Sequence, residues 1–313
     1  MSQPRIVFMG TADLAATALQ KLNEARLGDI ITVVSQPDRP RGRDLQLHPT
    51  PVKQRAIELG LPILQPEKAR SPEFLNRLRD LQPSLVVVAA YGQLLTGALL
   101  EIPAFGCLNV HTSLLPKYRG AAPIQWAIAN GESETGVTIM KMDVGLDTGP
   151  ILTQRTTPIT PQDTGQTLHD RLAVLGAELL VETIPHWFAG AIHPTNQIDE
   201  DSSPARKITK DDGRIDWSQS SQVIENRLRA FTPWPGNHTQ FVDGSQLRLL
   251  KIHRASSLPD ESGLPGHVLR VDRSGIVVAC GIGALQITEL QPESGRKMAA
   301  ADFLASRQPS LFV

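Results

Sequence analysis

The chain has 313 residues, of which 41% are hydrophobic and 20% charged, with a formal net charge of −1, as in a globular protein with room for two domains. Aromatic residues make up 4%, which argues against an extensive base-stacking surface for nucleic acid. No apolar run approaches the ~18 residues of a membrane-spanning helix, and the N-terminus lacks the pattern of a signal peptide. Cys107 and Cys280 lie in apolar runs without metal-like spacing, so we expect two reduced, buried thiols in a cytoplasmic protein.

The first two-thirds of the sequence alternate short apolar runs with helical patterns. Strands are predicted at 5–9, 30–35, 62–64, 85–90, 107–110, 137–142 and 151–157. Helices are predicted from the turn after Gly10 to residue 24, at 52–59, after Ser71, and at 164–188, where Pro185 is expected to end or bend the helix. Strands that alternate with helices indicate a doubly wound, mainly parallel α/β sheet.

The last third of the sequence changes in character. Residues 190–206 contain Pro194, Pro204 and an acidic run, which is typical of an exposed linker between a domain at 1–189 and a second at 207–313. Beyond a predicted helix at 220–230, runs rich in Val, Ile and Leu recur between turn residues at 247–252, 266–271, 275–279 and 284–290. This spacing predicts a small β-barrel or sandwich.

Residues 37–51 are rich in Pro, Arg and Gly and are predicted to form no regular element. The segment carries Arg39, Arg41 and Arg43. Because arginine suits phosphate contacts, this basic loop is a candidate for nucleic-acid binding. A solvated loop without a partner is the alternative.

Asn109 and His111 follow an apolar run, at the expected end of a buried strand. Alternate side chains of a strand share a face, so the amide and the imidazole should project together at an edge where α/β sheets place their chemistry. A turn-prone segment follows, and Asp147 lies in a Gly-rich loop between two predicted strands, from which a carboxylate can orient a histidine. A buried structural histidine and a metal site are the alternatives; because the other histidines lack metal-ligand spacing, we expect no metal.

An amide, an imidazole and a carboxylate suit the transfer of an acyl group from a bound donor to an amine. The amide can donate to the oxyanion, and histidine can accept the proton of the amine at neutral pH. A Ser or Cys nucleophile is not needed if the amine attacks directly. The residues therefore favour an acyl transfer centre.

Two runs resemble the folate-dependent formyltransferases: N-V-H-T-S-L-L-P-K-Y-R-G-A-A-P-I-Q at 109–125 and M-D-V-G-L-D-T-G-P at 142–150. The resemblance extends over nearly the whole chain. It is closest to the branch that acts on tRNA, through Q-P-D-R-P with a following G-R at 36–43, R-I-D-W at 214–217, and residues 229–236. It implies a Rossmann-like N-terminal domain and a C-terminal barrel of the OB type.

The resemblance also implies an activity and a site. A formyl group would pass from 10-formyltetrahydrofolate to the α-amino group of methionyl initiator tRNA, for translation initiation, in an enzyme expected to be a monomer. Catalysis is assigned to Asn109, His111 and Asp147. Donor binding is assigned to Tyr91, Gly92, Gln93, Leu94, Ser113, Leu114, Leu115 and Pro116, and tRNA binding to Arg39, Arg41 and Arg43.

Two positions depart from the family pattern. Thr112 stands where a smaller residue is expected, and the chain after Arg43 continues D-L-Q-L-H without further basic residues, which lowers the number of phosphate contacts available. Two alternatives stay open at this point. One is a formyltransferase that acts on an amino sugar nucleotide or on glycinamide ribonucleotide, and the other is a non-catalytic tRNA-binding protein.

Overall fold

The computed structural model describes residues 3–41, 46–243, 246–305, 307 and 309–313. They form two compact units between which the chain passes repeatedly. Unit 1 comprises Met1–Pro123, Glu134–Pro158 and His169–Ala205, and unit 2 comprises Ile124–Ser133, Ile159–Leu168 and Arg206–Val313. The second unit thus includes two short segments from the first two-thirds of the chain.

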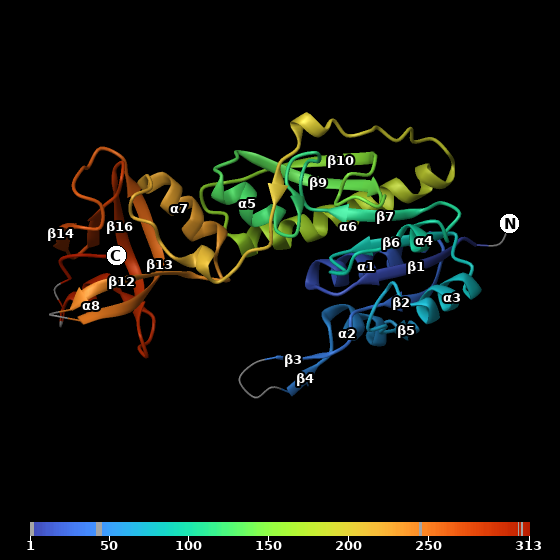
Figure 1. The fold of residues 1–313 in the computed structure, drawn as a ribbon, viewed down its shortest axis with the longest axis horizontal. Helices are drawn as coiled ribbons and strands as arrows, with labels where there is room; N and C mark the ends of the chain where they lie inside the picture. The colour runs from blue at the N-terminus through green and yellow to red at the C-terminus, as the bar shows by residue number, and fades with distance from the viewer. Residues whose placement is uncertain (1–2, 42–45, 244–245, 306, 308) are drawn as a thin grey trace. The chain divides into compact units, whose positions relative to one another are not determined.

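Unit 1 is built on a seven-stranded sheet with the order β10-β9-β7-β6-β1-β2-β5 (Figure 1). Five strands run parallel, β9 is antiparallel to β7, and β10 is antiparallel to β9. This mixed, mainly parallel sheet confirms the predicted α/β class. Its strands are β1 (Arg5–Gly10), β2 (Asp29–Val34), β5 (Ile63–Leu64), β6 (Leu85–Ala89), β7 (Cys107–His111), β9 (Glu134–Lys141) and β10 (Ile151–Pro158).

Helices connect the strands, and local capping explains where several of them begin. Thr50 and Ser71 each accept a hydrogen bond from the backbone three residues on, and a proline opens the helix that follows each. The helices of the first two-thirds are α1 (Asp13–Ala25), α2 (Pro51–Glu58), α3 (Pro72–Asp80), α4 (Gly97–Leu100), α5 (Pro123–Ala129) and α6 (Gly165–Phe188). Helix α6 extends to Phe188, as predicted for 164–188, and includes Pro185, so of the two expected effects of this proline the helix does not show an end there.

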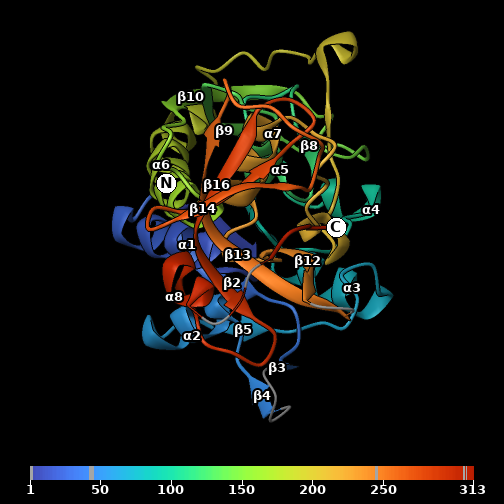
Figure 2. The same ribbon diagram turned by 90° about the vertical axis from the view of Figure 1, so that its left-hand side faces the viewer.

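The prediction of no regular element at 37–51 is also wrong. β3 (Arg39–Arg41) and β4 (Gln46–His48) pair antiparallel, with Pro40 opposite Leu47. Each strand of a two-stranded ribbon has one unpaired edge. A proline, which has no N–H to donate, can face its nitrogen to that edge without losing a hydrogen bond to the partner strand. This β3–β4 ribbon projects from unit 1 beyond β2 and α2 in both views (Figures 1 and 2).

Unit 2 holds an antiparallel sheet with the order β12-β13-β16-β15-β14, and β17 pairs with β16. It confirms the predicted C-terminal β domain. Its core includes Trp217, Phe241, Phe303 and Phe312. The elements are α7 (Ser221–Ala230), β12 (Asn237–Asp243), β13 (Gln246–Leu258), β14 (Val268–Asp272), β15 (Gly275–Ala279), β16 (Ala284–Pro292), β17 (Met298–Ala299) and α8 (Ala300–Leu304).

Short elements complete the chain. They are β8 (Arg119–Gly120), which pairs with β11 (Pro204–Ala205), and the 3-10 turns η1 (Asp199–Asp201) and η2 (Asp211–Gly213). Among the described residues, no helix combines the length and the apolar character needed to cross a membrane. Cys107 and Cys280 are both buried and unbridged, as predicted.

Candidate active site

Strand β7 carries Asn109 and His111 at its carboxyl end, in the interior of the sheet. It lies between β6, where Val88 pairs with Asn109, and β9, where Thr138 pairs with His111. Both polar side chains are nearly covered, with exposed fractions of 9% for Asn109 and 5% for His111. Burial of an amide and an imidazole is costly unless each has a hydrogen-bond partner, so their partners define the site.

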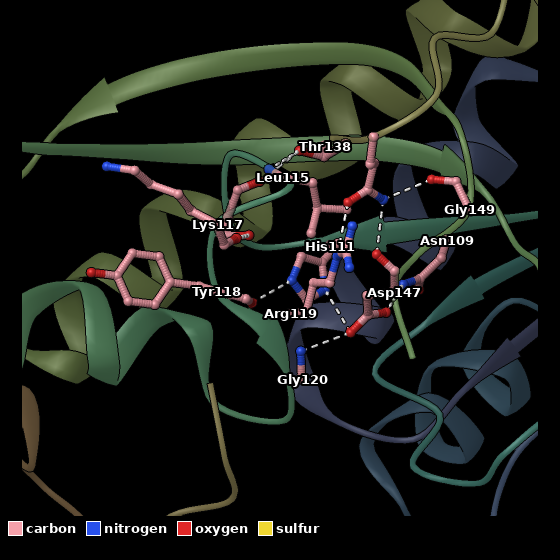
Figure 3. Close-up of polar contacts among 12 residues, drawn as sticks. Asn109, His111, Leu115, Lys117, Tyr118, Arg119, Gly120, Thr138, Asp147 and Gly149 are labelled. Carbon is pink, nitrogen blue, oxygen red and sulfur yellow. Dashed lines mark hydrogen bonds and ion pairs between the residues drawn. The ribbon is translucent and has the colours of Figure 1, made fainter. Parts of the chain in front are cut away.

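The carboxylate of Asp147 lies against both side chains (Figure 3). The Nδ2 of Asn109 is 3.5 Å from Oδ1, and the Nδ1 of His111 is 3.6 Å from Oδ2. The backbone N–H of Gly120 donates to Oδ2 at 2.9 Å. The structure therefore brings the three predicted catalytic residues together from two segments that are distant in the sequence.

The ring of His111 has one orientation that its partners fix. Its Nε2 lies 2.9 Å from the backbone oxygen of Tyr118, which can only accept a hydrogen bond. Nε2 therefore carries a hydrogen, and in the neutral ring the lone pair is on Nδ1, which faces Asp147. A proton taken up by His111 would sit on Nδ1, beside the carboxylate.

A side chain from another segment, Gln197, holds the loop that carries Asp147. Gln197 donates through Nε2 to the backbone oxygens of Asp147 at 2.8 Å and of Gly149 at 2.7 Å. Within the loop, Asp143 accepts from the hydroxyl of Thr148 at 2.7 Å. Asp147 has a φ of +54°, a left-handed conformation that is uncommon for non-glycine residues but that aspartate adopts more readily than most. Gln197 lies in the region predicted as a linker, and nothing in the local sequence marks it as a support of the site.

The segment after β7 is tied to β9 and β10. The hydroxyl of Thr138 donates to the Ser113 carbonyl at 2.7 Å and accepts from the Leu115 N–H at 3.1 Å. Gln154 donates to the Leu115 carbonyl at 2.8 Å, and the Ser113 hydroxyl donates to the Lys117 carbonyl at 2.6 Å. Of the predicted donor-binding residues in this segment, Ser113 and Leu115 are buried, whereas Leu114 and Pro116 are partly exposed.

Exposed apolar side chains lie on the loops at this edge of the sheet. Tyr91 is buried, and burial raises the pKa of its hydroxyl to about 12, but Leu94 is 81% exposed. Val144 and Leu146, beside Asp147 in sequence, are 80% and 59% exposed. A Cβ added to Gly97, the first residue of α4, would lie 3.5 Å from Val144, so the start of α4 adjoins the loop that carries Val144 and Leu146. The sequence analysis did not single out Val144 or Leu146, although apolar residues in a polar loop were the available signal.

The remaining predicted donor and tRNA residues lie on two other features. Gly92 and Gln93 belong to the loop after β6, where Gln93 accepts from the Ala69 N–H at 2.8 Å. Arg39 is exposed at the start of the β3–β4 ribbon. Arg41 ends β3, and its side chain lies outside the described residues, as does the whole of Arg43.

Comparison with known proteins decides the family. The family model described as "Formyl transferase" matches residues 4–184. The family model described as "Formyl transferase, C-terminal domain" matches residues 207–308. A methionyl-tRNA formyltransferase of Geobacter metallireducens is 50% identical over 300 residues, which cover 96% of this chain and 94% of that protein. The chain belongs to the methionyl-tRNA formyltransferase family.

Another member of the methionyl-tRNA formyltransferase family, from Myxococcus xanthus, is 50% identical over 304 residues, with 97% of this chain and 95% of that protein covered. Among solved structures, an N-formyltransferase from Helicobacter canadensis in complex with folinic acid and dTDP-3-aminofucose has a TM-score of 0.65 and 18% identity, over 92% of this chain and 99% of that one. At that identity the likeness is one of fold. Family membership confirms the prediction of a folate-dependent formyltransferase.

Proposed function

We propose that the enzyme transfers the formyl group of 10-formyltetrahydrofolate to the α-amino group of methionyl initiator tRNA, for translation initiation. The observation that carries this proposal is the convergence of Asn109 and His111 on the carboxylate of Asp147 at the carboxyl edge of the sheet. The relatives named above act, by their names, on methionyl-tRNA. Charged tRNA as acceptor also implies a cytoplasmic enzyme, and a single chain that carries the whole site is sufficient as a monomer.

Asn109 is assigned to the oxyanion. Its Nδ2 makes only a long contact of 3.5 Å with Asp147, so the amide N–H is available for a stronger hydrogen bond to the formyl oxygen. As the amine attacks the formyl carbon, the oxygen gains negative charge, and a donor fixed on a buried strand stabilises it without reorganisation.

His111 is assigned to the proton of the attacking amine. A nitrogen–carbon bond forms to the formyl carbon, the amine proton passes to Nδ1, and the bond from the formyl carbon to the folate nitrogen breaks as that nitrogen takes the proton from Nδ1. Asp147, 3.6 Å from Nδ1, stabilises the protonated ring during the transfer. The ester bond to tRNA withdraws electrons from the methionine amine, which keeps more of it neutral than in free methionine.

The donor is assigned to the loops beside this cluster, with Tyr91 to Leu94 and Ser113 to Pro116 as walls. The exposed side chains of Leu94, Val144 and Leu146 support the proposal because the ring system of a folate has large apolar faces that such residues can cover. The acceptor is assigned to the arginines of the β3–β4 ribbon and to the domain at 207–313.

The test is formyl transfer to charged initiator tRNA by Asn109→Ala, His111→Gln and Asp147→Asn. The glutamine can still donate to the Tyr118 carbonyl, and the asparagine can still accept from Gly120, so both keep the local structure while removing the titrating group. Each variant should lose about a hundredfold or more in kcat. His169→Ala, which alters a partly exposed histidine paired with Asp170 on α6, is the matched control and should keep normal activity.

Near-normal turnover in one of the three variants would remove that residue from the mechanism. The acceptor is tested by offering charged initiator tRNA, an amino sugar nucleotide and glycinamide ribonucleotide to the wild-type enzyme. Formylation of either small acceptor at a rate above that of the tRNA would overturn the acceptor assignment. Binding of tRNA without formylation of any acceptor would overturn catalysis itself.

A further inference from the structure

The β3–β4 ribbon leaves unit 1 through a small set of polar side chains that surround its two ends. We call Gln36, Asp38, Thr50, Lys53 and Gln65 the ribbon root. Asp38 immediately precedes β3, and Thr50 lies two positions beyond the end of β4. The ribbon projects away from the sheet, so the orientation of the whole ribbon depends on how these ends are held (Figure 1).

Asp38 is bound on both of its carboxylate oxygens. The Nζ of Lys53, on α2, lies 2.5 Å from Oδ2, and the Nε2 of Gln65, just after β5, donates to Oδ1 at 2.8 Å. These two partners hold the pKa of Asp38 below its usual value, so the side chain is a carboxylate at neutral pH. Two partners on separate elements restrict a side chain far more than one surface ion pair does.

The other end of the ribbon is held just as closely. The hydroxyl of Thr50 lies 2.6 Å from that of Ser35, at the end of β2, and this pair is buried. The same oxygen accepts the Lys53 N–H at 3.1 Å and caps α2. One helix, α2, therefore contributes to both ends of the ribbon.

The ribbon root also contacts the proposed donor wall. Gln36 donates through Nε2 to the Tyr91 carbonyl at 2.8 Å, and the Thr11 hydroxyl donates to the same oxygen at 2.9 Å. Gly92 has a φ of +80°, and a Cβ there would lie 2.7 Å from the Gln36 amide. Glycine at 92 thus allows Gln36 to reach the carbonyl. The strands β2, β1 and β6 are neighbours, so this contact runs across the carboxyl edge of the sheet toward β7.

We propose that Asp38, Lys53 and Gln65 are positioning residues for the acceptor, which fix the direction of the β3–β4 ribbon relative to the donor wall that Gln36 contacts. The inference rests on the proposed role of the ribbon in binding tRNA. A ribbon that already has its binding orientation in the free enzyme loses less conformational entropy when the acceptor binds.

Substitution of Asp38 distinguishes this positioning role from a purely electrostatic role of the ribbon root. It is an acidic residue next to Arg39, so its negative charge repels RNA phosphate. If local charge alone mattered, Asp38→Asn would bind tRNA more tightly and lower its KM. If Asp38 positions the ribbon, the same substitution frees the root and raises the KM. The two explanations predict opposite signs.

The experiment measures steady-state kinetics of the full-length enzyme with charged initiator tRNA and formyl donor, for Asp38→Asn and Lys53→Met. The KM for tRNA should rise by about tenfold in each, with kcat within about twofold of wild type, because the chemical groups are untouched. The dependence of log KM on log salt should keep its slope, because the number of phosphate contacts is unchanged. Gln36→Leu should also raise the KM for the donor.

Two further variants serve as controls. Arg55→Met removes the ion pair with Glu58 at 3.3 Å on the same helix and the hydrogen bond to Gln20 on α1 at 3.1 Å. Neither contact involves the ribbon root, so the KM for tRNA should be unchanged. Lys53→Arg can still pair with Asp38 and should restore most of the affinity lost in Lys53→Met. A general loss of folding would instead appear as a fall in kcat in every variant of α2.

An unchanged or lowered KM in Asp38→Asn would overturn the inference. So would a reduced salt slope in Lys53→Met, since that would make Lys53 a direct phosphate contact. The double variant Arg39→Ala/Arg41→Ala tests the underlying role of the ribbon. If it raises the KM for tRNA while Asp38→Asn does not, only the positioning role fails. If it leaves the KM unchanged, the ribbon does not bind tRNA and the positioning role fails with it, whereas formyl transfer itself is tested by the variants of Asn109, His111 and Asp147.

Discussion

Gly120 illustrates how one residue without a side chain maintains the site. Its φ of +123° lies in the left-handed region, and a Cβ there would be 2.6 Å from the backbone oxygen of Ala205. The same residue donates its N–H to Asp147 at 2.9 Å. Any larger residue would push β8 away from β11 and move the donor from the carboxylate. A sequence shows the glycine but not the strand that passes so close to it.

The two thiols lead to a prediction about single residues. Burial raises the pKa of both Cys107 and Cys280 to about 12. At pH 8 only about one molecule in ten thousand would then carry a thiolate at either position, and the thiolate is the reactive form. In the native protein, thiol-reactive reagents should therefore label neither cysteine over minutes, whereas both should react after denaturation in guanidinium chloride. Rapid labelling of native protein, followed by absorbance or mass spectrometry, would contradict the buried placement.

Whole elements were predicted where the signal is local. The parallel strands of unit 1 read as mainly apolar runs because both faces of each strand are buried, as in β6. β12 was missed because two of its inward residues, Asn237 and Thr239, are polar. Asn237 donates to the Leu228 carbonyl at 3.1 Å, and Thr239 accepts from the Trp217 indole at 2.9 Å. Because these partners lie in other segments of the chain, the sequence of β12 alone does not show the apolar–polar alternation that predicts a strand.

The short helix η2 gives a prediction about pH. The Asp212 carboxylate accepts from the Arg206 guanidinium, with Nη1 at 2.9 Å, and from the backbone and hydroxyl of Thr209 at 2.8 and 2.9 Å. The Arg206 hydrogen bonds, with those from Thr209, hold the pKa of Asp212 well below its usual 3.8. A lowered folded-state pKa stabilises the fold above the unfolded value, and this contribution is lost as the pH falls below about 4.

Asp212→Asn should therefore lower the free energy of unfolding by about 2 kcal/mol at pH 7, and the difference from wild type should shrink as the pH falls toward about 3. Urea unfolding at several pH values measures it. Asp211→Asn, at the exposed neighbouring position, is the control and should behave like wild type at every pH. A penalty that stays constant down to pH 3 would show that Asp212 acts through packing rather than charge.

At the scale of the whole molecule, unit 2 is not simply the C-terminal third of the chain. It includes Ile124–Ser133 and Ile159–Leu168. The ring of Trp126 lies 6.0 Å from that of Phe231, and the N–H of Gln166 donates to the Thr232 carbonyl at 3.2 Å. A cut at the apparent linker would therefore leave these two segments without the residues that cover them.

The fragment 1–206 should consequently be less stable than the full chain. We expect its melting temperature, followed by circular dichroism, to fall by roughly 10 °C or more, because the apolar surface around Trp126 becomes exposed. Tryptophan fluorescence would shift to longer wavelength in the fragment. A fragment that melts with the full chain would show that the two segments do not need unit 2. The contribution of unit 2 to tRNA affinity is better measured with point substitutions in the intact enzyme.

The sequence by itself determined the α/β class, the C-terminal β domain and the family, because apolar periodicity and motif spacing are local properties of the chain. The tertiary structure alone decided which groups meet. Tyr118 fixes the His111 ring, Gly120 and Gln197 fix the Asp147 loop, and Lys53 with Gln65 hold Asp38. A hydrogen bond forms only where two groups approach within about 3 Å, and that approach depends on how distant segments pack.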